Sequence, residues 1–149
     1  AIALCGDGGF TMLGLGDLLT QVQRKARVVN VIFNNGMLDF VNIEQQEAGF
    51  VPFGTDFVNP DFSQVATALG ARGIRVEEPG DVRDALQAAL AHIDGPVVVD
   101  VVVDRYALAL PSHVPAATAK GFTLSMAKQV LSGQMDQVIE TVKHNVRLL

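Results

Sequence analysis

Glycine and polar residues follow two apolar segments of the chain, at the point where each segment ends. Gly6-Asp7-Gly8-Gly9 comes after the first apolar segment, and Asn34-Asn35 comes after the second. Asp7 and Asn35 are 28 residues apart, which is enough chain for one helix and a returning strand. Open α/β sheets bind their ligands at the edge where the carboxyl ends of neighbouring parallel strands meet. We therefore expect the side chains of Asp7 and Asn35 to converge there.

One carboxylate and one amide oxygen at such an edge suit a hard cation such as Mg²⁺, which also takes phosphate and water oxygens. The glycines allow backbone N–H groups to approach a phosphate, and a helix that begins near Phe10 directs its positive end there. Each feature alone is common, because Gly-Asp-Gly also makes tight strand-to-helix connections and Asn34-Asn35-Gly36 is an ordinary turn sequence. Their combination predicts a site for Mg²⁺ and a phosphate group.

The elements that must position this site alternate between strand-like and helix-like segments. The expected strands are rich in Val, Ile, Leu and Phe, as is typical of parallel strands buried on both faces: Ile2–Cys5, Val28–Phe33, Ile74–Val76 and Pro96–Val103. Helical periodicity marks Phe10–Lys25, Phe62–Gly70 and Asp81–Ile93, and Asp61 is the expected N-cap of the second helix. This alternation predicts an α/β fold with a parallel sheet flanked by helices.

Composition limits the class of protein. The chain has 149 residues, 49% hydrophobic and 18% charged, with a mean hydropathy of +0.31, which indicates about one folded domain. Cys5, the only cysteine, excludes an intrachain disulfide and a Cys-based zinc site, and it is expected to be a small buried side chain. No apolar run approaches the roughly 18 residues of a membrane-spanning helix, and an isoelectric point near 5.0 argues against a nucleic-acid partner.

The chain changes character near residue 110. Residues 1–112 carry 7 Lys and Arg against 14 Asp and Glu, whereas residues 113–149 carry 4 against 2. A linker rich in Ser, Ala and Thr over 112–119 precedes two helical patterns. We therefore expect a ligand-binding domain over 1–110 and a linker with a helical tail over 111–149.

The last helical pattern is amphipathic over about four turns. Its apolar residues recur three and four positions apart: Met135, Val138, Ile139, Val142, Val146 and Leu149. Two roles fit this pattern, namely packing on the rest of the chain and lying in a bilayer interface with the apolar face buried. Histidines at 92, 113 and 144 do not group with carboxylates in the sequence, so we expect no metal or catalytic role for them.

Gly6-Asp7-Gly8 and Asn34-Asn35, with fewer than 30 residues between them, resemble the diphosphate-binding motif of the thiamine-diphosphate-dependent enzymes. Further segments are similar to the same domain of that family: Phe33–Leu38, Asn59–Phe62, Gly73–Val76 and Gly95–Val102. The resemblance covers essentially the whole chain and implies the thiamine-diphosphate-binding fold. Because the chain begins without Met, directly in a strand, we expect this fold to be incomplete at its N-terminus.

The resemblance implies a role for each matching residue. Asp7 and Asn35 match the two side-chain ligands of Mg²⁺, and Met37 matches a third ligand that uses its main-chain carbonyl. Asn34 is expected to orient the turn and not to bind metal. The residues expected to line the diphosphate and the rest of the cofactor are Asp7, Gly8, Gly9, Asn35, Gly36, Met37, Leu38, Asp39, Phe40 and Val41.

Two further residues match catalytic positions of the oxidases in this family. Phe40 matches an aromatic residue near the thiazolium and the flavin, and Glu44 matches an active-site carboxylate. The plain structural alternatives are a core phenylalanine in a loop for Phe40 and a solvated helix charge for Glu44.

Within the family, residues 6–13 and the tail most resemble the bacterial pyruvate oxidases that reduce quinone. This implies a full-length enzyme that decarboxylates pyruvate to acetate and CO₂ and passes electrons through FAD to a membrane quinone. In the family, FAD is bound by a separate domain, and the glutamate that activates the cofactor comes from another one. The chain alone should therefore be inactive. The resemblance also implies a dimer or tetramer in the bacterial cytoplasm, attached to the inner face of the membrane through lipid contacts of the tail.

Two other functions remain open at this point. One is a carboligase similar to acetohydroxyacid synthase, although the Gln-His-Gln pattern after the Asn pair of those enzymes is replaced here by Met37-Leu38-Asp39-Phe40. The other is a non-catalytic module for lipid binding or subunit assembly.

Overall fold

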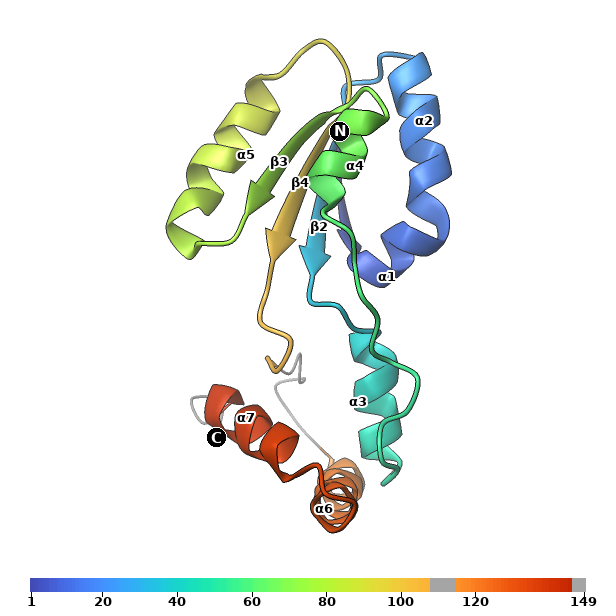
Figure 1. The fold of residues 1–149 in the computed structure, drawn as a ribbon, viewed down its shortest axis with the longest axis vertical. Coiled ribbons are helices and arrows are strands. Elements are labelled where there is room, and N and C mark those ends of the chain that lie inside the picture. Colours follow the sequence, from blue (N-terminus) through green and yellow to red (C-terminus); the bar gives the residue numbers. More distant parts are fainter. Residues whose placement is uncertain (108–114, 146–149) are drawn as a thin grey trace. The chain divides into compact units, whose positions relative to one another are not determined.

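A four-stranded parallel sheet forms the centre of the first part of the chain. The computed structural model describes residues 1–107 and 115–145. The sheet has the strand order β1-β2-β4-β3, with the bounds β1 (Ile2–Gly6), β2 (Val29–Asn34), β3 (Arg72–Val76) and β4 (Val97–Val102). Each expected strand is present within two residues of its predicted bounds, and the α/β prediction is confirmed (Figure 1).

Helices cover both faces of this sheet (Figure 1). The first helical segment runs through α1 (Asp7–Gly9), a π-helical turn over Phe10–Gly14 and α2 (Leu15–Gln23). The later helices are α4 (Phe62–Ala68) and α5 (Val82–Ala91), the latter preceded by a 3₁₀ turn over Pro79–Asp81. As predicted, Asp61 caps α4, because its carboxylate accepts hydrogen bonds from the N–H groups of Ser63 (2.9 Å) and Gln64 (3.1 Å).

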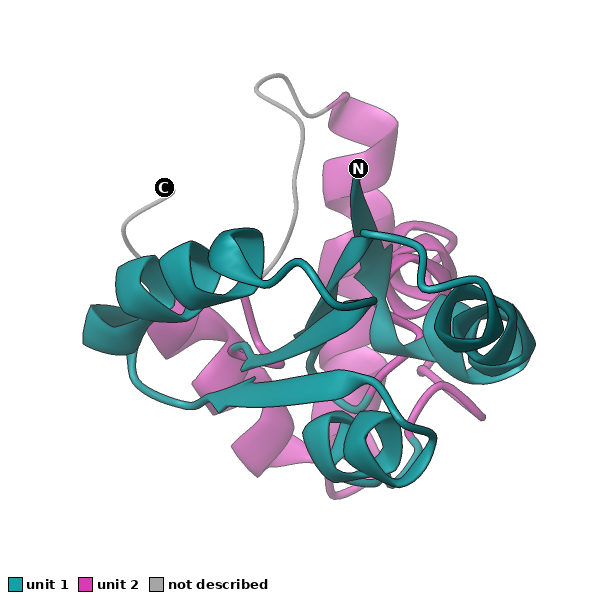
Figure 2. Cartoon of the chain, turned by 90° about the horizontal axis from the view of Figure 1, so that it is seen from above, with its two compact units in different colours: residues 1–36, 57–103 teal, residues 37–56, 104–149 magenta. Residues whose placement is uncertain are grey.

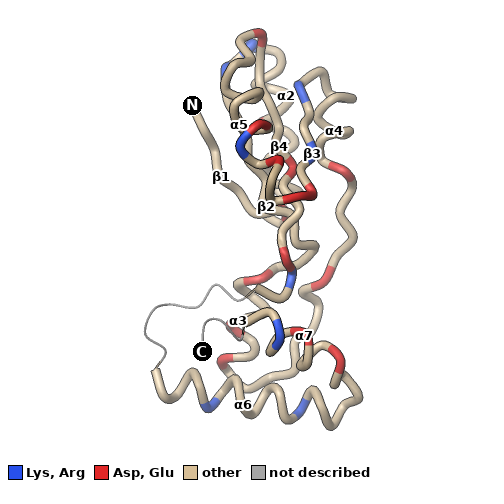
Figure 3. The backbone as a smooth tube through the Cα atoms, turned by 90° about the vertical axis from the view of Figure 1, so that its left-hand side faces the viewer, with Lys and Arg blue, Asp and Glu red and all other residues tan. Residues whose placement is uncertain are grey.

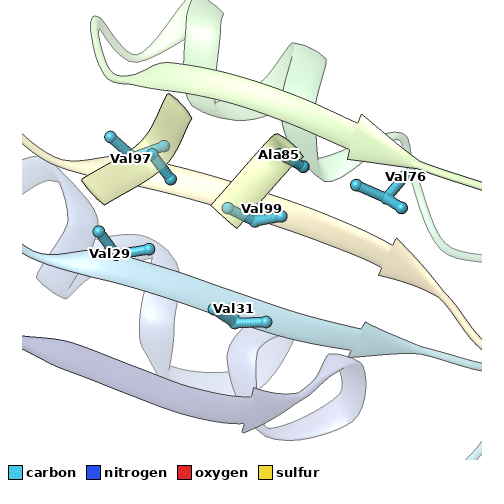
Figure 4. Close-up of a cluster of buried hydrophobic side chains, with 7 residues drawn as sticks. Val29, Val31, Val76, Ala85, Val97 and Val99 are labelled. Carbon is cyan, nitrogen blue, oxygen red and sulfur yellow. The ribbon is translucent and has the colours of Figure 1, made fainter. Parts of the chain in front are cut away.

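Alternating residues of the strands point to opposite faces and build two apolar clusters. On one face, valines of β2, β3 and β4 pack against Ala85 and Ala89 of α5 (Figure 4). On the other face, Ile32 and Val98 pack with Phe10, Leu18 and Phe62. Leu90, near the end of α5, and Ile93, which follows the helix, are 53% and 62% exposed, so neither belongs to this core.

The expectation that every strand is buried on both faces is wrong for β1. This strand lies at an edge of the described sheet and pairs only with β2. Ile2 and Leu4 are therefore 60% and 69% exposed. Cys5 is half-buried and not fully buried as expected, and this partial burial raises the pKa of its thiol.

A second compact unit contains the helices α3 (Asp39–Glu47), α6 (Ala116–Leu131) and α7 (Met135–Asn145). The first unit comprises residues 1–36 and 57–103, and the second comprises residues 37–56 and 104–149 (Figure 2). This division differs from the expected boundary at residue 110, because the segment after the Asn pair packs with the C-terminal helices. α6 also begins inside the expected linker, directly after Pro115.

Close backbone contact joins α3 to α6 within the second unit. A Cβ atom on Gly121 would lie 1.7 Å from the carbonyl oxygen of Glu47, so only glycine fits at this crossing. Ser125 Oγ donates a hydrogen bond to the carbonyl oxygen of Phe50 (2.6 Å), and Lys128 Nζ donates one to that of Gly49 (2.7 Å). The C-terminal helices are therefore fastened to the segment that follows the predicted cofactor-binding residues.

The predicted amphipathic tail helix is present as α7, which ends at Asn145. Met135, Ile139 and Val142 are 51%, 41% and 43% exposed, so the apolar face is open and does not form a core. Val146 and Leu149 of the predicted face lie outside the described residues. None of the helices in the described parts of the chain has the length and apolarity that crossing a bilayer requires.

Candidate metal and diphosphate site

The structure brings Asp7 and the Asn34-Asn35 turn together at the carboxyl end of the sheet, as the sequence predicts. Asp7 follows β1 directly and is 3% exposed, and the turn closes β2. Asp7 Oδ2 accepts hydrogen bonds from the backbone N–H of Asn35 (2.9 Å) and of Gly36 (2.7 Å). Two strand ends that are 28 residues apart in the chain are thus tied by one carboxylate.

The two oxygens of the Asp7 carboxylate differ in their surroundings. Oδ2 accepts three hydrogen bonds, the third from the side-chain Nδ2 of Asn59 at 2.7 Å. Oδ1 accepts one hydrogen bond, from the backbone N–H of Gly8 at 2.8 Å. Oδ1 therefore keeps electron-pair capacity for a cation, while Oδ2 is saturated by donors that hold the carboxylate in place.

The oxygen atoms around Asp7 suit a Mg²⁺ ion that is bound by one carboxylate and by several uncharged groups. In the described parts of the chain, no three His, Cys, Asp or Glu side chains lie close enough together to form a metal cluster. Asp7 would thus supply the single charge, and amide, carbonyl, phosphate or water oxygens would complete an octahedral shell, which is the arrangement Mg²⁺ favours beside substrate phosphates. The ligand roles of Asp7, Asn35 and Met37 remain predictions.

Asn34, which is expected to orient the turn, is held by hydrogen bonds at both ends of its side-chain amide. Its Nδ2 donates a hydrogen bond to Oδ1 of Asp100 (2.9 Å), and its Oδ1 accepts one from Asn59 Nδ2 (2.8 Å). Asp100 is fully buried in β4, and its Oδ2 accepts hydrogen bonds from the N–H of Phe62 (3.1 Å) and from Nη1 of Arg75 (2.8 Å). A continuous polar chain thus runs across the carboxyl end of the sheet.

We call this set the edge network: Asp7, Asn59, Asn34, Asp100 and Arg75. Its last three residues come from three neighbouring strands, β2, β4 and β3. Sequence reasoning missed the roles of Asn59, Asp100 and Arg75. The one available sign was a carboxylate inside the Val-rich strand Val97–Val102, since a fully buried Asp requires partners.

The predicted cofactor-lining residues fall in both compact units. Gly8 is buried and Gly9 is exposed at the start of the helical segment, next to Asp7. Gly36 has a φ of +69°, and a Cβ atom there would lie 3.2 Å from the carbonyl oxygen of Phe57, so the turn requires glycine. Met37 begins the second unit and pairs with Asp56 through a single β-bridge.

Phe40 and Glu44 lie on α3, four residues apart, so that they share one face of the helix. Phe40 is 71% exposed and Glu44 is also exposed. The alternative of a core phenylalanine is therefore wrong for the described chain. A catalytic role for Phe40 and Glu44 remains a prediction, and their exposure leaves both open to a ligand or a partner domain.

A polar cavity of about 340 Å³ lies inside the second unit. Met37 and Asp39 line it together with amide side chains such as Asn42, Gln46 and Gln129. The amide of Asn42 donates to Thr55 Oγ1 (3.0 Å), and Gln129 Nε2 donates to Ser125 Oγ (3.0 Å). Buried amides thus replace the apolar stripe that an ordinary core helix would show, which explains why the sequence did not reveal α3.

His144 pairs with two carboxylates in the folded chain, which its place in the sequence did not reveal, and its expected lack of a metal or catalytic role stays a prediction. Its ring pairs with Asp104 through Nδ1 and with Glu140 through Nε2 at 3.4 Å. The hydrogen bond with Asp104 raises the pKa of His144 above its ordinary value. Burial by itself would raise the pKa of Asp104, but the hydrogen bonds with His144 and the Tyr106 N–H outweigh it and lower that pKa. The pair fastens the end of α7 within the second unit.

The chain is similar to several thiamine-dependent proteins. It is 38% identical over 148 residues to the Bacillus subtilis protein YdaP, whose name describes it as thiamine pyrophosphate-containing; the match covers 99% of this chain and 25% of YdaP. It is 32% identical over 142 residues to the pyruvate oxidase of Lactiplantibacillus plantarum, covering 93% of this chain and 23% of that protein. It is 35% identical over 103 residues to the acetolactate synthase of Bacillus subtilis, covering 69% and 18%.

Solved structures share the fold. A 4-hydroxybenzoylformate decarboxylase of Rhodococcus jostii, which depends on thiamine diphosphate, superimposes with a TM-score of 0.62 at 32% identity, covering 69% of this chain and 19% of that chain. The benzoylformate decarboxylase of Polynucleobacter necessarius superimposes with a TM-score of 0.61 at 28% identity, covering 70% and 19%. The chain thus spans 18–25% of the length of these relatives and solved structures.

A family model described as the C-terminal TPP-binding domain of thiamine pyrophosphate enzymes matches residues 1–101. Thiamine pyrophosphate is the same compound as thiamine diphosphate. The matched segment contains every residue of the edge network and both strand ends that the motif predicts. The chain therefore belongs to the thiamine pyrophosphate enzyme family, and residues 1–101 are its C-terminal cofactor-binding domain.

Proposed function

We propose that the chain is the diphosphate-binding part of a flavin-dependent pyruvate oxidase. One observation supports the oxidase over other members of the family. The matches to YdaP and to pyruvate oxidase cover 99% and 93% of the chain and so extend into the C-terminal helices, whereas the match to acetolactate synthase covers 69%. The similarity to an oxidase therefore includes the tail in addition to the shared cofactor domain.

In the proposed reaction, pyruvate and water give acetate and CO₂, and two electrons and two protons pass through FAD to a quinone. Thiamine diphosphate, when bound, supplies the electron sink for the loss of CO₂. This chain would hold the diphosphate end of the cofactor: Asp7 and Asn35 with the carbonyl of Met37 would bind Mg²⁺, a metal typical of the family. Phe40 and Glu44 would face the reacting end. FAD and the cofactor-activating glutamate would come from companion domains of a dimer or tetramer.

We further propose that the tail attaches the enzyme to the cytoplasmic face of a bacterial membrane, near its quinone. α7 presents exposed apolar residues at 135, 139 and 142, and Lys143 lies beside them in the sequence. α6 carries Lys120 and Lys128 and no acidic residue (Figure 3). On α7 itself Lys143 pairs with Glu140 at 2.7 Å, so the exposed apolar face supplies the main support for this proposal and the lysines of α6 add to it. The overall acidic composition gives no reason to expect a nucleic-acid partner.

A carboligase similar to acetolactate synthase is the second candidate. It is favoured by the 35% identity to the Bacillus subtilis enzyme and by matches to further acetolactate synthases at 32–34% identity. Both candidates share loss of CO₂ from pyruvate, and they differ in the fate of the remaining two-carbon unit. A non-catalytic assembly or lipid-binding module is the third reading.

Product analysis separates these functions. The complete enzyme, supplied with pyruvate, Mg²⁺, thiamine diphosphate and FAD, should reduce its flavin and release acetate in equal amount to CO₂. A control without thiamine diphosphate should release no CO₂. Acetolactate as the main product, without flavin reduction, would contradict the oxidase and favour the carboligase. Absence of any turnover, with vesicle binding retained, would favour the module.

A further inference from the structure

Asn59 joins the predicted metal ligand to the turn that closes β2. Its Nδ2 lies 2.7 Å from Asp7 Oδ2 and 2.8 Å from Asn34 Oδ1. Both partners are oxygens that accept hydrogen bonds here, so the NH₂ group of the amide must face them. One side chain thus bridges the two strand ends that form the predicted site.

The carbonyl oxygen of the Asn59 amide, Oδ1, supports a role for this residue beyond packing. Asn59 Oδ1 is buried and has no hydrogen-bond partner among the described residues. Burying a polar atom without a partner is unfavourable, and native proteins contain few such atoms. Asn59 therefore keeps its position at a cost in stability, which is typical of residues that serve a site.

We propose that Asn59 is a positioning residue for the metal site, holding Asp7 so that Oδ1 of Asp7 faces the cation. The inference rests on the proposed role of Asp7 as a ligand of Mg²⁺. Asn59 Nδ2 and the N–H groups of Asn35 and Gly36 occupy Oδ2, which fixes the plane of the carboxylate. Oδ1 is thereby left as the oxygen with capacity for a cation. Partners behind metal ligands commonly act in this way.

The clamp is anchored inside the sheet. Asn34, the second partner of Asn59, is held through its own Nδ2 by the fully buried Asp100 at 2.9 Å. Asn59 itself precedes Pro60, whose ring restricts the conformation of the residue before it, and the chain then enters α4 at its cap. Asn59 is thus fixed by its backbone on one side and by the edge network on the other.

Mg²⁺ titration of cofactor binding tests this proposal. Thiamine diphosphate binding to the complete protein is followed by calorimetry over a range of Mg²⁺ concentrations, for wild type, Asn59→Ala and Asn59→Leu. Leucine fills the space of the amide and leaves no room for a substitute water. We expect the Mg²⁺ concentration for half-saturation to rise about 10–100-fold in both variants, the range for groups that orient metal ligands. When the titration is repeated with Ca²⁺, the half-saturating metal concentration should rise less in the variants, because Ca²⁺ tolerates irregular coordination geometry and Mg²⁺ does not.

Asn30→Ala is the matched control. Asn30 is also a buried amide in the same unit, donating to Gln21 Oε1 (2.8 Å), but it lies in the first half of β2, away from Asp7. Its removal should lower the melting temperature and leave the Mg²⁺ requirement within about twofold of wild type. An unchanged Mg²⁺ requirement in both Asn59 variants, or an equal rise in Asn30→Ala, would overturn the positioning role alone. A wild-type protein that binds no thiamine diphosphate with Mg²⁺ would overturn both this inference and the proposed function.

Discussion

Asp100 is the buried anchor of the edge network, and its removal should destabilise the first unit strongly. The change Asp100→Ala deprives Asn34 Nδ2 and the Phe62 N–H of their acceptors at 2.9 and 3.1 Å. Each buried donor left without an acceptor costs about 1–3 kcal/mol. Arg75 loses an ion pair at 2.8 Å, but its side chain is 32% exposed, so water replaces most of that interaction. We therefore expect a loss of about 2–6 kcal/mol, centred near 4 kcal/mol.

Urea denaturation followed by circular dichroism measures this loss. The midpoint should fall while the slope of free energy against urea stays constant, because the surface exposed on unfolding hardly changes. Asp94→Ala removes an exposed carboxylate from the same unit and should shift the stability by less than about 0.5 kcal/mol. A loss below about 1 kcal/mol in Asp100→Ala would refute the view that Asp100 anchors the network.

Three further predictions concern the second unit. Pairing with Asp104 raises the pKa of His144, so the stabilisation from this pair is complete below the ordinary His value of 6.5 and is lost as pH rises through the raised pKa. The melting temperature of wild type should therefore fall over this pH range, and His144→Gln should remove that pH dependence. Deleting 135–149 should abolish binding to anionic vesicles, measured by co-sedimentation, while turnover with a soluble electron acceptor survives. Gly121→Ala should lower the melting temperature by several degrees, since its Cβ would lie 1.7 Å from the Glu47 carbonyl oxygen.

Each of these predictions has a contrary result. Equal pH dependence in wild type and His144→Gln would show that another group titrates. Loss of soluble-acceptor turnover on deletion of 135–149, without any vesicle binding in the intact enzyme, would show that the tail packs on the protein. An unchanged melting temperature in Gly121→Ala would mean that α3 and α6 can move apart without a loss of stability.

The sequence predicts the part of the site that follows directly from strand ends. Asp7 and Asn35 stand one position beyond β1 and β2, and the geometry of neighbouring parallel strands then brings them together. The cap at Asp61 was likewise predictable, because a side-chain acceptor before a helix acts locally. These features depend on spacing of a few residues or on one rule of sheet geometry.

The rest depends on contacts that spacing does not encode. Asn59 reaches Asp7 across 52 residues and Asp100 reaches Asn34 across 66, and neither pair shows a local pattern. α3 was not predicted because its buried residues include the amides Asn42 and Gln46 in place of an apolar stripe. The exposure of β1 also escaped prediction, since an apolar strand has the same composition at an edge as in the middle of a sheet.

The Mg²⁺-dependent affinity for thiamine diphosphate in Asp7→Ala tests the central claim most directly. Calorimetric titration of the complete protein at fixed Mg²⁺ should show more than about 100-fold weaker binding, because even groups behind a metal ligand are worth 10–100-fold. Asn35→Leu should weaken binding in the same way, and Asp17→Ala, which removes an exposed carboxylate from α2, should bind as wild type does. Unchanged affinity in Asp7→Ala at ordinary Mg²⁺ would contradict the assignment of this sheet edge as the metal and diphosphate site.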